Sequence, residues 1–243
     1  MLYRYDDGNN WFEKIQAQGA LCLTVCLLAG CLRPQAEFLP QNAATQTYSV
    51  EHLAQEPELD RMDGLKAFRS AVPMALREKD RVILYRDSWS GPQDLSGEIR
   101  LAHSDHALYL AAQVTDDDVQ YAGHPGEWSG DAVNLFLKTE TEEGTREFIF
   151  KFSCAGTRYC YYNRLSYNGE EYQWGASRAE RVKGGYWIAA EIPKRNLGLL
   201  GMGDERVWFN VSIEDNNKGG YMMLLGQSEG FLNEPAWIAA ELR

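Results

Sequence analysis

Residues 132–153 read AVNLFLKTETEEGTREFIFKFS. On either side of the turn signal Glu143-Gly144, apolar side chains occupy every second position, and most of the side chains between them are polar. Side chains at every second position lie on one face of a β-strand, so this stretch predicts two antiparallel strands that bury one face. The apolar positions are Val133, Leu135, Leu137, Phe148, Phe150 and Phe152.

The same period of two recurs in three further runs, at residues 108–114, 186–192 and 207–213. Separate short runs of this kind, without helices alternating between them, predict antiparallel sheets that stack face to face. The sequence therefore predicts an all-β protein, an antiparallel β-sandwich over residues 51–243. The segment Asp60–Ala75 lacks this alternation, and its sequence allows one or two helical turns.

The N-terminal part of the chain resembles the leader of a bacterial lipoprotein. Residues 20–30 carry no charge and are mostly apolar. The run has the length of the apolar core of a signal peptide and is too short for a membrane-spanning helix. The run ends in Leu28-Ala29-Gly30-Cys31, which is similar to a lipobox, where the cysteine thiol receives a diacylglycerol. We expect a signal peptide at residues 1–30, a lipid on Cys31 and a tether at residues 31–50. The alternative is a buried apolar helix with a chance cysteine, and the acidic residues before the run are atypical of a signal peptide.

The residues around the lipidation site and the remaining cysteines give expectations about location. Leu32 follows Cys31, where an aspartate would retain a lipoprotein in the inner membrane. We expect an exported protein, anchored in the outer membrane and facing the periplasm or the cell surface. In that oxidising compartment, Cys154 and Cys160 are expected to form a disulfide across a hairpin connection. Two buried thiols are the alternative.

Composition and motifs limit the classes of function. The net charge of −11 leaves no basic surface of the kind that nucleic-acid binding needs. No nucleophile elbow, zinc-protease helix motif or glycine-rich phosphate loop occurs in the sequence. We therefore expect a protein that is not an enzyme, holds no organic cofactor and binds no nucleic acid. Its 7 Trp and 13 Tyr suit a surface that presents aromatic rings to a ligand.

Several motifs follow one another through the predicted sandwich. They are Asp63-Gly64, ALYL at 107–110, VTDD at 114–117, WSGDAVNLF at 128–136, GYWIAAEIP at 185–193 and FNV at 209–211. Their order and spacing, across roughly Asp60 to Arg243, resemble the family 9 carbohydrate-binding modules and their relatives in the DOMON-like superfamily. The resemblance implies a non-catalytic β-sandwich that binds oligo- or polysaccharides and often holds structural calcium.

The resemblance also implies which residues contact the sugar. Trp128 occupies the place of an aromatic ring on which a pyranose stacks, and Phe231 lies closest to the place of a second such ring. Asn134 and Lys151 occupy positions from which polar side chains hydrogen-bond sugar hydroxyls. Trp208, in an alternating run, is expected to be structural or to line one face of a sheet.

A calcium site is implied at the end of one predicted strand. Asp116, Asp117 and Asp118 form an oxygen-rich cluster, which is the chemistry that Ca²⁺ prefers. A solvated acidic turn is the alternative.

Two other functions remain open. The first is a haem-binding DOMON-like domain for electron transfer, and the second is a structural lipoprotein without a ligand. The residue types that axial haem ligation needs are present as Met74, Met222, Met223, His124 and Lys151.

Overall fold

The computed structural model divides the chain into two compact units, residues 1–42 and residues 43–243. The residues that it describes all lie in the second unit: 48–59, 66–121, 130–142, 144–162, 165–167, 174–199, 205–217, 221–226 and 237–242. The predicted leader, Cys31, Trp128 and Phe231 lie outside them. The helical segments among the described residues all lack the length and the apolar character of a membrane-spanning helix.

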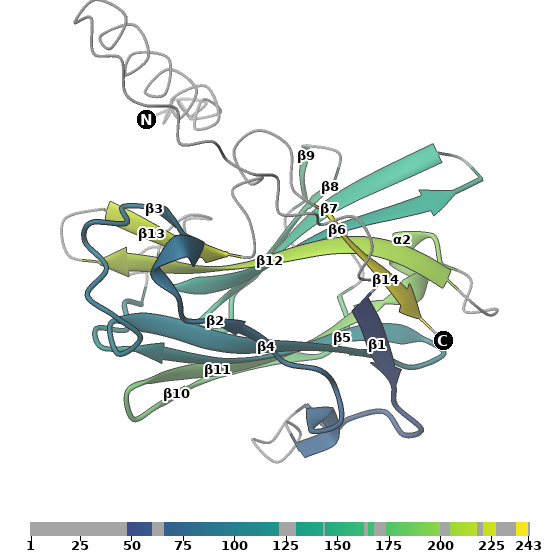
Figure 1. The fold of residues 1–243 in the computed structure, drawn as a ribbon. Helices are drawn as coiled ribbons and strands as arrows, with labels where there is room; N and C mark the ends of the chain where they lie inside the picture. The colour runs from purple at the N-terminus through teal and green to yellow at the C-terminus, as the bar shows by residue number, and fades with distance from the viewer. Residues whose placement is uncertain are drawn as a thin grey trace, which may run out of the picture. The chain divides into compact units, whose positions relative to one another are not determined.

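Two sheets face each other in the second unit (Figure 1). The sheet around β6, called here the β6 sheet, has the strand order β14-β12-β6-β7-β8-β9, and β13 pairs with both β12 and β3. Its strands are β14 (Ile238–Leu242), β12 (Glu205–Asn217), β6 (Ala132–Thr141), β7 (Gly144–Ser153), β8 (Arg158–Tyr162), β9 (Leu165–Tyr167), β13 (Tyr221–Gly226) and β3 (Val82–Leu84). These strands are antiparallel, as predicted.

The opposite sheet, called here the β5 sheet, has the order β10-β11-β5-β4, with β2 beside β4. Its strands are β10 (Ser177–Val182), β11 (Gly185–Pro193), β5 (Ala107–Asp116), β4 (Leu95–His103) and β2 (Met74–Leu76). Strand β1 (Tyr48–His52) joins the two sheets, because its first half pairs with β14 and its second half with β4, both in parallel. Short helical turns, η2 (Lys79–Arg81) and α2 (Lys194–Leu197), precede β3 and follow β11.

The core lies between the sheets and contains the alternating apolar residues. Val133, Leu135 and Leu137 of β6 are fully buried there, as are the phenylalanines of β7. Leu108 and Leu110 of β5 are buried in the same cluster. The predicted all-β antiparallel sandwich is therefore confirmed, and so is the face of each strand that the period of two assigned to the core.

The β5 sheet differs from the expectation in burying both faces. A second apolar cluster forms on its outer face, where Leu53, Leu59 and Phe68 pack against the β5 sheet residues Tyr109 and Trp187. A single 3-10 turn at residues 66–68 brings Phe68 into this cluster. The segment before β2 therefore acts as a third layer that covers the aromatic residues of this face.

The predicted disulfide between Cys154 and Cys160 is wrong, since both are buried free thiols. In the β7–β8 hairpin Phe150 lies opposite Cys160. Cys154 is four residues beyond Phe150, or about 13 Å along the strand, whereas a disulfide needs Cα atoms within about 7 Å. Burial raises the pKa of each thiol to about 12, which makes both thiols poor nucleophiles.

Candidate functional site

Four polar side chains gather on the outer face of the β6 sheet. Asn134 of β6 lies between Lys151 of β7 and Ser212 of β12 in one cross-strand row. Glu214 of β12 belongs to the next row on the same face, because it lies two residues beyond Ser212. We call Asn134, Lys151, Ser212 and Glu214 the polar cluster.

Hydrogen bonds connect all four members of the polar cluster. The Asn134 Nδ2 donates to Ser212 Oγ at 3.0 Å and to Glu214 Oε1 at 2.8 Å. The second carboxylate oxygen, Glu214 Oε2, forms an ion pair with Lys151 Nζ. Each of the four residues is only 1% exposed. Desolvating a buried charged pair costs about as much free energy as the attraction between the two charges returns. Stability alone therefore does not explain why this pair lies on the outer face of the sheet.

One acceptor in the polar cluster has no donor. The side-chain oxygen of Asn134, Oδ1, is buried and accepts no hydrogen bond. A buried carbonyl oxygen of this kind costs about 1–3 kcal/mol when it is left unsatisfied. A ligand hydroxyl would satisfy this oxygen only by entering the buried cluster. The two acceptors of the Asn134 Nδ2 already set the orientation of the amide.

The structure brings together two of the four residues predicted to contact sugar, Asn134 and Lys151, and adds Ser212 and Glu214 to them. The alternation of residues 207–214 places Ser212 and Glu214 on the outer face, but the sequence does not tell which strands lie beside β12. The cross-strand register is therefore the information that was missing. Trp128 and Phe231 lie outside the described residues.

The residues considered for haem ligation do not form a site within the described part of the chain. Met74 is buried in the core on β2, and Lys151 is paired with Glu214 on the opposite face of the β6 sheet. His124 and the side chains of Met222 and Met223 are outside the described structure.

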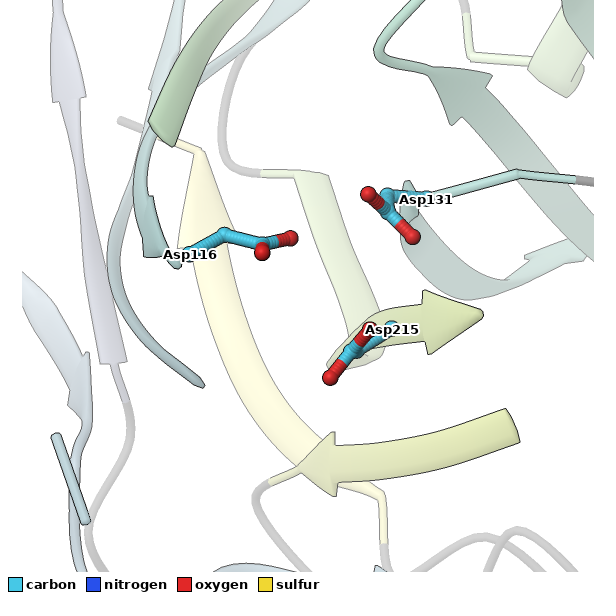
Figure 2. A group of neighbouring side chains, drawn as sticks. All are labelled: Asp116, Asp131 and Asp215. Carbon is cyan, nitrogen blue, oxygen red and sulfur yellow. The ribbon is translucent and has the colours of Figure 1, made fainter. Parts of the chain in front are cut away.

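Three aspartates from different elements meet at one end of the space between the sheets. Asp116 ends β5, Asp131 immediately precedes β6, and Asp215 lies near the end of β12. One carboxylate oxygen from each lies within 4.8 Å of those of the other two, and all three residues are buried. Figure 2 shows the three carboxylates around a common centre. We call them the aspartate cluster.

Backbone amides hold the aspartate cluster in place. Asp131 accepts hydrogen bonds from the Gln120 N–H at 2.5 Å and from the Asn216 N–H at 2.8 Å. The Asp116 Oδ1 accepts from the Asp118 N–H at 2.8 Å, whereas its Oδ2 is buried without a partner. These bonds hold the side chains of Asp116 and Asp131 in place, and they leave an unsatisfied carboxylate oxygen in the interior.

Burial disfavours negative charge on these carboxyl groups. It is the main cause that raises the pKa of Asp131 to about 7 and that of Asp215 to about 8, and the neighbouring aspartates raise both further. Burial also raises the pKa of Asp116. Near neutral pH the cluster therefore either retains protons or requires a cation.

The donor set fits Ca²⁺. Oxygen ligands about 2.4 Å from a shared ion are at most about 4.8 Å apart, and hard carboxylate oxygens are the ligands that Ca²⁺ prefers. Asp116, one of the predicted ligands, belongs to this cluster. The other two do not: Asp117 is exposed, and Asp118 contributes its backbone N–H. The other members of the cluster are Asp131 and Asp215, and neither was predicted as a ligand.

Comparisons with known proteins agree with this architecture. Residues 77–229 match the family model described as carbohydrate family 9 binding domain-like. A family 9 carbohydrate-binding module from Caldicellulosiruptor kristjanssonii in complex with glucose has a TM-score of 0.58 at 13% identity, over 82% of this chain and 96% of that chain. The complex of such a module from the same organism with cellotriose has a TM-score of 0.57 at 12% identity, with 82% and 94% covered.

A protein from Bacteroides uniformis ATCC 8492, whose name proposes carbohydrate binding, has a TM-score of 0.62 at 12% identity, over 82% of this chain and 99% of that chain. No curated protein sequence matches the chain. At these identities the solved structures establish the shared fold, and the family model extends over well over half of the residues. The chain belongs to the carbohydrate family 9 binding domain-like family, a family of non-catalytic binding modules.

Proposed function

We propose that this protein binds carbohydrate on the outer face of the β6 sheet, with the polar cluster at the floor of the site. The observation that carries the proposal is the buried Asn134 Oδ1, an acceptor without a donor beside a fixed ion pair. Sugar hydroxyls supply donors of this kind, and a site whose acceptor is otherwise unsatisfied rejects ligands that lack them. Solved relatives with this fold bind glucose and cellotriose.

Aromatic stacking completes the proposed site. Trp128 and Phe231 are proposed to hold the apolar face of a pyranose ring, on the basis of their places in the sequence. The polar cluster would then hydrogen-bond the hydroxyls at the rim of the ring. Binding of this kind requires no reaction, in agreement with a non-catalytic family.

Isothermal titration calorimetry against a panel of neutral oligosaccharides tests the proposal. Asn134→Ala is expected to weaken binding of the sugar that the wild-type protein selects by roughly 10- to 100-fold, because the acceptor and the orientation of Glu214 are lost together. Trp128→Ala is expected to weaken binding as well. Thr139→Val is the matched control, since Thr139 lies on the same strand and faces the core, where it donates to Leu197 O at 2.8 Å. Equal losses in Asn134→Ala and Thr139→Val, or no binding by the wild type, would overturn the site.

We further propose that Cys31 carries a lipid that anchors the protein in the outer membrane, where its sandwich faces the periplasm or the cell surface. The support is the apolar run that ends in Leu28-Ala29-Gly30-Cys31, with Leu32 after it. An anchored module would hold a glycan close to the membrane without diffusing away.

Labelling with radioactive palmitate in a bacterial host tests the anchor. The wild-type chain is expected to incorporate the label and to fractionate with membranes, whereas Cys31→Ser is expected to do neither. Cys26→Ser, five residues upstream, is the control and is expected to behave as wild type. Label retained in Cys31→Ser would contradict the assignment.

We also propose that the aspartate cluster binds one structural Ca²⁺. Its support is the oxygen donor set, the unsatisfied Asp116 Oδ2 and the raised pKa values of Asp131 and Asp215. The ion would neutralise buried charge and connect β5 of one sheet to β12 of the other.

A further inference from the structure

A group of two tryptophans and a lysine lies on the outer face of the β6 sheet, apart from the polar cluster. Trp208 of β12 and Trp237, which immediately precedes β14, share one cation between them. The Lys138 Nζ lies 4.8 Å from the centre of the Trp208 ring and 5.3 Å from that of Trp237. We call Trp208, Trp237 and Lys138 the tryptophan platform.

The cross-strand register places the platform on the same outer face as the polar cluster. Trp208 lies opposite Lys138 of β6 and Ala239 of β14, whose small side chain covers little of an indole. The neighbour of Trp237, Ile238, pairs with the core residue Phe209, so Trp237 itself points to the outer face. Both tryptophans are half-buried, whereas Phe136 and Asn210, in the row between the platform and the polar cluster, are buried. The two tryptophans of the platform are therefore partly exposed to solvent, whereas the neighbouring row of Phe136 and Asn210 on the same face is not.

The platform and the polar cluster are separated by a definite length. Trp208 precedes Ser212 by four residues on β12, and Lys138 follows Asn134 by four on β6. At about 3.3 Å per residue the two groups are about 13 Å apart along the strands. This span is longer than one pyranose ring, so a single sugar cannot contact both groups. An oligosaccharide that contacts both must pass over the buried row of Phe136 and Asn210.

The chemistry of the platform suits a neutral sugar. The apolar C–H face of a hexose packs on an aromatic ring, and the ammonium of Lys138 can donate to a hydroxyl oxygen at the edge of the ring. An anionic glycan is disfavoured because the chain has a net charge of −11. A neutral hexose chain fits both the rings and the charge.

We propose that the tryptophan platform is a second sugar subsite, which holds further units of a neutral hexose chain whose end occupies the polar cluster. This subsite rests on the proposed function, and it makes the protein a binder of chains rather than of single sugars. Affinity then rises with chain length up to the point at which the platform is filled.

Affinities of the full-length protein for one-, three- and six-unit members of the cello-, xylo- and manno-oligosaccharide series test the subsite. For the series that wild type binds, the six-unit sugar is expected to bind about tenfold more tightly than the single sugar. Trp208→Ala and Trp237→Ala are each expected to remove most of this gain, and Trp208→Phe part of it. The control is Tyr121→Ala, which is expected to keep the gain. Tyr121 is an exposed aromatic residue outside the platform, and it also has a cation over its ring, Arg181 at 5.6 Å. Asn134→Ala is expected to weaken all chain lengths alike.

These outcomes separate the two proposals. Equal binding of one- and six-unit sugars by the wild type would overturn the subsite and leave the proposed function standing. The same holds if Trp208→Ala and Trp237→Ala keep the gain with chain length while their thermal transitions show that they are folded. If the wild type binds no member of the three series, both are overturned for neutral hexose and xylose chains. Size-exclusion chromatography tests whether a second copy of this chain occupies the platform instead of a sugar. A wild-type dimer that Trp208→Ala converts to a monomer would make the platform an interface between two copies and would overturn the subsite.

Discussion

Calcium at a concentration about 100 times its dissociation constant is expected to raise the unfolding temperature of this protein by about 5–10 °C at pH 8. Binding to the folded state alone stabilises by about 2.7 kcal/mol at that excess. In a domain of this size each kcal/mol moves the transition by about 2–4 °C. The reason is the aspartate cluster, where Asp116, Asp131 and Asp215 bring buried carboxylates within 4.8 Å of one another.

The effect is expected to depend on pH in a definite direction. The pKa of Asp131 is raised to about 7 and that of Asp215 to about 8, above the ordinary value of 3.8. Between about pH 4 and 8 the metal-free folded state therefore binds protons that the unfolded chain has released, so its stability falls as the pH rises. Calcium competes with these protons, and its stabilising effect should be small at pH 5.5 and largest near pH 8.

Thermal unfolding in Ca²⁺ and in chelator, at both pH values, measures this effect. Asp215→Asn is expected to lose most of the rise and, in chelator at pH 8, to be more stable than wild type because one buried charge is gone. Asp105→Asn is the control, since the Asp105 side chain is 77% exposed. A wild-type protein that responds to calcium equally at pH 5.5 and pH 8, or an Asp215→Asn variant that keeps the full response, would contradict the site.

Local patterns in the sequence were sufficient for the strands and for which face of each strand is buried. In residues 132–153, for example, the alternation of Val133 with Asn134 distinguishes core from outer face without any knowledge of neighbouring strands. Such information is local because the side-chain direction depends only on the backbone of the strand itself. The same alternation predicts that Asn134 and Lys151 lie on the outer face, and the family resemblance selects them as candidate sugar contacts.

The partners of these residues could not be found locally. Glu214 reaches Lys151 because β12 and β7 lie on either side of β6. Asp215 lies close to Asp116 because the ends of β12 and β5 lie at the same end of the space between the sheets. Both relationships depend on strand order, which no short motif contains. The same reason explains the wrong disulfide: the spacing of Cys154 and Cys160 suggested proximity, but the hairpin register separates them.

The second large effect concerns the ion pair of the polar cluster. Lys151→Met is expected to lower the free energy of unfolding by about 3–5 kcal/mol, because Glu214 remains buried and charged with Asn134 as its remaining partner in the cluster. The unfolding temperature should fall by roughly 6–20 °C. Glu214→Gln alone should destabilise for the converse reason, since it leaves the ammonium of Lys151 without its carboxylate.

The double variant Lys151→Met/Glu214→Gln separates stability from function. Removing both charges together is expected to recover most of the lost stability, because a buried ion pair hardly exceeds its own desolvation cost. If the pair exists to orient Asn134 and to present charge to a sugar hydroxyl, the double variant should fold as well as wild type and bind the selected oligosaccharide at least tenfold more weakly. Denaturant unfolding and calorimetry measure the two quantities independently. A double variant that binds sugar normally would show that the pair serves neither purpose, and one that stays as unstable as Lys151→Met would make the pair a structural element of the sheet.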